Sequence, residues 1–184
     1  MKDKLNLIRG PRIETQLEEA STVADLERNT KSFDPKTKKR EYAVDEIQVK
    51  QLKLIPYHNT GQLEVTGTIT SGGSTYDTTI MFDNIEYHET DEPNNVSFVG
   101  SDGDEHHITM IQLSRSNVKV RCGCLDFYWR FASYNAKDGS LHGEAPSPYQ
   151  SRTDRPPVNT RSVPGVCKHL LKTVIALKQT GIAR

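Results

Sequence analysis

Three cysteines and one histidine are the residues of this sequence whose types and spacing could do chemistry. They stand in two close pairs, Cys122 with Cys124 and Cys167 with His169. Thiolate sulfur and imidazole nitrogen are ligands that Zn²⁺ prefers, and four of them complete its tetrahedral shell. We therefore predict one structural metal ion, zinc, held by these four residues, with no open position for a substrate water.

Other uses of the same residues stay open at this stage. The alternatives are inert thiols and an iron–sulfur cluster with three Cys ligands and one His ligand. A Cys167–His169 nucleophile and base is disfavoured, because enzymes of that kind bring the two residues together from distant parts of the sequence. Three cysteines cannot all pair within one chain, and the start of the chain lacks the apolar stretch of a secretory signal. Reduced thiols are therefore expected.

The spacing of each pair predicts the elements that position it. Cys122 and Cys124 lie at the end of an expected strand, 118–122, where side chains two residues apart point the same way, and Gly123 is expected to let the backbone curl around the ion. Cys167 is expected at or just before the first turn of a helix that spans about 166–180. The positive end of that helix would stabilise its thiolate.

The arrangement Cys-X-Cys followed by Cys-X-His at a helix start resembles the SWIM-type zinc finger, over residues 117–178. The resemblance implies zinc ligation by Cys122, Cys124, Cys167 and His169, and SWIM-type modules are associated with DNA-handling proteins. The surrounding segments, VKVRCGCLDFYWRF and VPGVCKHLL, are also similar to small structural proteins of tailed bacteriophages. That similarity implies a virion component of the head-neck, tail or baseplate.

An aromatic run follows the first cysteine pair. We expect residues 127–131 to be largely buried next to the metal. The alternative is a partner-binding surface made by Tyr128, Trp129 and Arg130, because aromatic residues and arginine dominate interface energetics.

The remaining pattern predicts an α+β fold, with an antiparallel β-sheet lobe followed by a small metal-clamped lobe that ends in a helix. Short segments rich in Thr, Val, Ile and Tyr predict one sheet of roughly five or six strands. The expected strands span 51–57, 62–71, 75–82, 95–100, 106–113 and 118–122. Residues 135–159 are expected to form a long loop rich in Gly, Ser and Pro.

Three regions follow from this pattern: a polar N-terminal arm at 1–50, a β lobe at 51–120, and a metal-binding lobe at 117–184. A short helix is plausible within the arm at 14–28. The arm and the segment 136–160 are expected to order only against a neighbouring subunit. Isolated histidines, His58, His88 and His142, are assigned no role, and His106-His107 is expected in a solvated turn.

Composition limits the function classes. The 24 Lys and Arg residues balance 24 Asp and Glu residues, and no apolar run is long enough for a membrane helix. No phosphate-binding loop, paired catalytic carboxylates or serine motif is found. We therefore expect a non-enzymatic, metal-stabilised assembly protein that contacts other protein subunits, in a virion assembled in the host cytoplasm. No membrane partner or small-molecule substrate is expected. A zinc-containing DNA- or protein-binding module is the alternative, because basic residues concentrate in the metal lobe.

Overall fold

The computed structural model describes residues 20–33, 47–147 and 157–184, which form an α+β fold with two antiparallel sheets. The larger sheet has four strands in the order β1-β2-β3-β7, and each neighbouring pair is antiparallel. These strands are β1 (Ile47–Tyr57), β2 (Gln62–Ser71), β3 (Ser74–Phe82) and β7 (Val118–Cys122). The expected fold class is confirmed: antiparallel sheets with a C-terminal helix next to the Cys and His residues.

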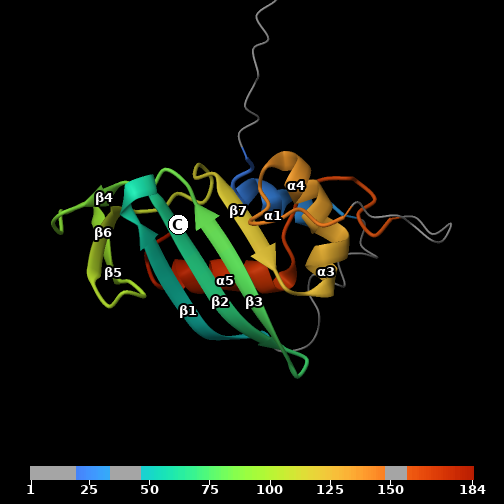
Figure 1. Ribbon diagram of the computed structural model, residues 1–184, viewed down its shortest axis with the longest axis horizontal. Coiled ribbons are helices and arrows are strands. Elements are labelled where there is room, and N and C mark those ends of the chain that lie inside the picture. The colour runs from blue at the N-terminus through green and yellow to red at the C-terminus, as the bar shows by residue number, and fades with distance from the viewer. Residues whose placement is uncertain (1–19, 34–46, 148–156) are drawn as a thin grey trace, which may run out of the picture.

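The helix α5 (Lys168–Gln179) packs across one face of the larger sheet, and no described helix covers the opposite face (Figure 1). In β2, buried positions alternate with half-buried ones along the whole strand, as a strand with one face on the core requires. The helix contributes Leu170, Val174 and Leu177 to the same core. A hydrogen bond of 2.7 Å between the hydroxyls of Thr78 and Thr173 ties the helix to β3.

The smaller sheet, at the left of Figure 1, differs from the single sheet expected from the sequence. It contains β4 (Tyr87–His88), β6 (Glu105–Thr109) and β5 (Asn95–Val99), in the order β4-β6-β5. The strand expected at 106–113 ends at Thr109, because the chain beyond it pairs with the C-terminus instead. The Ile111 amide donates to the Ile182 carbonyl and the Leu113 amide to the Arg184 carbonyl, each at 3.0 Å.

Part of the expected N-terminal arm belongs to the core. The helix α1 (Val23–Lys31) begins at a capping box, in which Thr22 and Asp25 satisfy each other's backbone amides. Val23 and Leu26 on this helix are buried. The expectation that the arm orders only against a neighbouring subunit is therefore wrong for residues 20–33, whereas 1–19 and 34–46 lie outside the described residues.

The chain after β7 is helical before it becomes a loop. It forms α3 (Leu125–Phe127), the π-helical segment η2 (Tyr128–Ala132) and α4 (Ser133–Asp138), so the first part of the expected loop is helix. Residues 140–142 then bond to Val120 of β7 through two backbone hydrogen bonds. Residues 148–156 lie outside the described part of the chain. None of the described helices has the length and apolar character needed to cross a membrane.

Candidate metal centre

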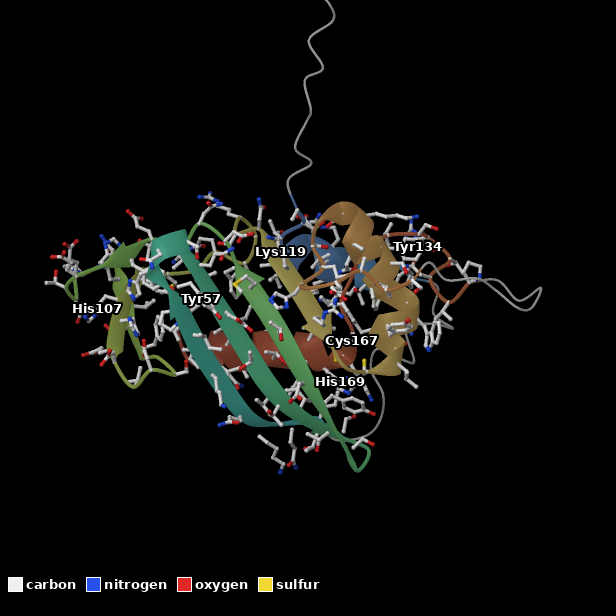
Figure 2. The ribbon with its side chains drawn as sticks, viewed as in Figure 1. Tyr57, His107, Lys119, Tyr134, Cys167 and His169 are labelled. Atoms are coloured by element: carbon white, nitrogen blue, oxygen red, sulfur yellow. The ribbon has the colours of Figure 1, made fainter. Side chains whose placement is uncertain are left out.

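The four predicted ligands come together from three elements. Cys122 ends β7, Cys124 precedes α3, Cys167 precedes α5 and His169 lies in the first turn of α5. Their ligand atoms all lie within 4.8 Å of one another, and all four residues are buried. Figure 2 shows Cys167 and His169 at the end of α5 that faces α3. These residues form a Cys₃His group placed to bind a metal ion.

The first pair is positioned by the edge of the larger sheet and by the start of α3. Cys122 lies opposite Thr78 of β3, and the amide of Gly123 donates to the Asp77 carbonyl at 3.0 Å. The sheet therefore fixes the backbone between the two cysteines. Cys124 has an extended backbone at the N-cap of α3, and its Sγ accepts a 3.3 Å hydrogen bond from the amide of Phe127. An amide donor of this kind stabilises a thiolate.

The second pair depends on the packing of the segment before α5. Cys167 has an extended backbone (φ −84°, ψ 171°), and its carbonyl accepts the amide of Leu171 at 3.0 Å. Asn135 holds Gly165 through two side-chain hydrogen bonds, of 3.1 and 3.0 Å. A Cβ atom on Gly165 would lie 2.5 Å from the Phe131 ring, so this glycine allows the segment to approach η2. Close packing is therefore the physical reason for a glycine at this position.

The imidazole of His169 is held between the thiols and a tyrosine. Its Nδ1 lies 3.7 Å from Sγ of Cys122. Its ring stacks on Tyr76 at a centroid distance of 4.3 Å, with 19° between the planes. No partner for its buried Nε2 is found among the described residues.

Sequence reasoning missed Tyr76, although a signal was present. Tyr76 shares the inward-facing phase of β3 with Thr78, which lies opposite Cys122.

The thiols share their protons unevenly. The pKa of Cys124 lies far below its ordinary value, because the thiols of Cys122 and Cys167 and then His169 and the Phe127 amide donate to its sulfur. Donation to Cys124 raises the pKa of Cys122, and burial raises the pKa of Cys167. Without metal, these shifts favour the thiolate at Cys124 and the protonated thiol at Cys122 and Cys167. A bound cation would displace those two protons.

The donor set and its spacing fit a single ion. Two ligands of a tetrahedral zinc, one sulfur and one nitrogen, lie about 3.6 Å apart if their bonds are about 2.3 and 2.05 Å long. The 3.7 Å between Cys122 Sγ and His169 Nδ1 matches this separation. Four protein donors would fill such a shell, as they do in structural zinc sites.

Of the three residues named as a partner-binding surface, two are exposed and one is buried. Tyr128 and Trp129 are 42% and 50% exposed, and their rings meet edge to face at 4.7 Å. Leu125, one turn earlier, is 71% exposed. Arg130 is fully buried, with its guanidinium 2.9 Å from a carboxylate oxygen of Asp126.

The expectation that the run 127–131 is largely buried holds for Phe127, Arg130 and Phe131. It is wrong for Tyr128 and Trp129, which are exposed.

The histidines outside the metal centre also form contacts that the sequence did not reveal. His58, in the short helix η1 (His58–Thr60), lies with Nε2 3.0 Å from Nδ1 of His106 on β6. His106 is buried, and its Nε2 lies 3.1 Å from the Asp102 carboxylate. The solvated turn expected at His106-His107 is wrong for His106. The contact between His58 and His106 could not be predicted from local spacing, because the two residues are 48 positions apart in the sequence.

The Cys₃His group, which is placed to bind a metal ion, is the clearest candidate functional feature of the described residues in this α+β fold. Comparisons with protein-family models, with curated proteins and with solved structures give no match.

Proposed function

We propose that this chain is a non-enzymatic structural protein, in which zinc locks α5 against β7 and α3 so that a rigid surface can be presented to neighbouring protein subunits. The assembly proposed is the virion of a tailed bacteriophage, as the sequence resemblance implies. The observation that carries the structural role is the closed, buried set of four donors. A site with four protein ligands leaves no position for substrate, so its contribution is to stability.

Zinc is preferred over an iron–sulfur cluster on the spacing of the donors. Two thiolates bound to one tetrahedral zinc by bonds of about 2.3 Å lie about 3.8 Å apart. The donors here lie within 4.8 Å of one another, so a small contraction brings them to the spacing of one ion. A cluster places several metal atoms between its thiolates and needs wider separations. A SWIM-type centre, with zinc bound by the same four residues, is the corresponding proposal for the site.

The surface beside the metal supports a protein partner. Leu125, Tyr128 and Trp129 are exposed on α3 and η2, directly after the ligand Cys124. Aromatic side chains on a rigid support are typical anchors of protein interfaces. A DNA-binding module is the second candidate, and the lysines of α5 are the feature that favours it. The balanced net charge of the chain argues against it.

Two measurements test the proposal. Mass spectrometry of purified phage particles is expected to find the chain at a fixed copy number relative to the major structural proteins. Its absence from particles, in a host where the chain is expressed, would contradict the virion role. A duplex DNA binding assay separates the second candidate, which requires an affinity that falls steeply as salt is raised.

A further inference from the structure

The charges of this electrically neutral chain are separated into two regions. Residues 83–105 contain eight Asp and Glu residues and no Lys or Arg. Residues 157–184 contain five Lys and Arg residues and no Asp or Glu. The first region supplies the edges of the smaller sheet, and the second supplies α5. The chain therefore has one acidic and one basic surface, although its net charge is zero.

The acidic surface lies on the loop between β4 and β5 and on the β5–β6 hairpin. Its exposed carboxylates, none of which forms an ion pair with a described residue, belong to Glu89, Asp91, Glu92, Asp104 and Glu105. Val99 lies opposite Glu105 in the hairpin and is 67% exposed. An exposed apolar side chain therefore lies among unpaired negative charges.

The basic surface lies on the side of α5 that faces away from the sheet. Lys168, Lys172 and Ile175 follow one another at helical spacing and share this side, and Lys178 flanks it. None of the three lysines forms an ion pair with a described residue. Ile175 is 47% exposed. This surface has the same composition as the acidic one with the sign reversed, an apolar side chain among unpaired charges.

We propose that the basic surface of α5 binds the acidic surface of a second copy of this chain. The inference rests on the proposed assembly role and names a partner for it. Among the described residues no ion pair joins the two surfaces, and both carry charges that a second copy would pair. A second copy offers both surfaces at once. A nucleic acid would match the lysines but would be repelled by the eight acidic residues of 83–105.

The geometry of this contact is head-to-tail, because two different surfaces meet. Such a heterologous contact closes into a ring if the rotation allows and otherwise continues into an open chain. Charges at an interface mainly accelerate the encounter and fix its orientation, and salt screens them over about 10 Å at 0.1 M. The association is therefore expected to be strong at low salt and weak at high salt.

Sedimentation velocity of the full chain, loaded with zinc, tests the proposal. The wild-type protein is expected to sediment as larger species at low salt and as a monomer at about 0.5 M salt, where screening is strong. Lys168→Glu combined with Lys172→Glu is expected to weaken association at least about tenfold at low salt. Glu89→Lys combined with Glu92→Lys is expected to do the same. The matched control is Lys50→Glu with Lys53→Glu, which makes an identical charge change on β1 and is expected to leave association unchanged.

Mixing the two double variants provides the decisive comparison. Each variant keeps one native surface, and the two altered surfaces are also opposite in sign, so the mixture is expected to regain association. Zinc content and circular dichroism of every variant confirm that it is folded.

A wild-type monomer at low salt, equal weakening by the control, or no recovery in the mixture would overturn the proposal. DNA binding by the basic surface without self-association would overturn it as well. If the monomeric chain is still found in phage particles, the assembly role stands and self-association alone fails.

Discussion

His169 is the one histidine among the four predicted ligands. The effect of substituting it can therefore be compared with the same substitution of a histidine outside the site. His169→Gln removes one of four donors and leaves a buried amide beside the thiols. We expect metal affinity to fall by more than about 100-fold, since even residues that only orient a ligand contribute about 10–100-fold. The measurement is zinc content after gel filtration, by elemental analysis.

The control for that prediction is His107→Gln. His107 is half-buried on β6, where it bonds to Ser97, and it belongs to no metal group. Its variant is expected to keep about one zinc per chain. Equal zinc in the two variants would show that His169 is not a ligand.

Protons and the metal compete for the same sulfurs. Because the pKa values of Cys122 and Cys167 are raised, both thiols are protonated in the metal-free chain at neutral pH, whereas Cys124 is already a thiolate. Metal binding then releases about two protons, and affinity rises about 100-fold for each pH unit around neutrality. Metal affinity falls as the pH falls, because protonation of the thiols favours the metal-free form.

Competition titration with a chromophoric chelator at several pH values measures this slope. A slope near zero would mean that the thiols have already lost their protons without metal.

The four ligands could be predicted from the sequence because their spacing is local within each pair. The neighbours of the site could not. The rings of Tyr76 and His169 stack although the two residues are 93 positions apart in the sequence. Such a contact depends on the register of β3, which residue types alone do not fix.

At the level of elements, two glycines near the ligands are expected to behave differently. A Cβ on Gly165 would lie 2.5 Å from the Phe131 ring and 2.7 Å from the Thr30 hydroxyl. Gly165→Ala must therefore separate α5 from η2, and we expect a loss of about 1–3 kcal/mol, as for other overpacked cores. Chemical denaturation of the zinc-loaded protein measures the change in the free energy of unfolding.

Gly123→Ala is the control, although Gly123 lies between two ligands. The nearest atom to its added Cβ is the Asp77 carbonyl oxygen at 3.9 Å, and its φ is not positive. A change within about 0.5 kcal/mol is expected, as for other substitutions away from special features. The sequence suggested that Gly123 lets the backbone curl, but its backbone requires no glycine. A loss at Gly123 as large as at Gly165 would contradict this packing argument.

The elements themselves were predicted well where periodicity was strong. The alternation in β2 and the apolar stripe of α5 gave both elements close to their observed bounds. The prediction of a single sheet was wrong, because the strands form two sheets. Periodicity shows that a segment is a strand but not which strand it pairs with, and β3 pairs with β7 rather than with the β5–β6 hairpin.

Across the whole molecule, the metal centre joins parts of the chain that are far apart. It links the end of β7 and the start of α3 to the start of α5, and α5 supplies Leu170, Val174 and Leu177 to the core beneath the larger sheet. The charge separation is also a property of the whole chain. The numbers of acidic and basic residues can be read from the sequence, but they define two surfaces only when the positions of α5 and the smaller sheet are known. The contribution of α1 to the core could not be predicted, because its apolar face is short and its surroundings are polar.

Removal of the metal is expected to loosen the molecule unevenly. Without the ion, α5 keeps its apolar contacts but loses the link that holds its first turn to β7 and α3, and two buried protonated thiols remain there. Structural zinc supplies folding free energy of about 10 kcal/mol or more in small domains. We therefore expect amide hydrogen exchange, measured by mass spectrometry, to accelerate at least about tenfold in α5 and α3 when a strong chelator strips the metal, which corresponds to about 1.4 kcal/mol of lost local stability. The smaller sheet provides the internal control, because it is held to the larger sheet by other contacts, including the 3.0 Å bond between His58 and His106. Its exchange should change least. Uniform acceleration of both regions would indicate global unfolding on metal loss, and unchanged exchange in α5 would show that the metal does not clamp this helix.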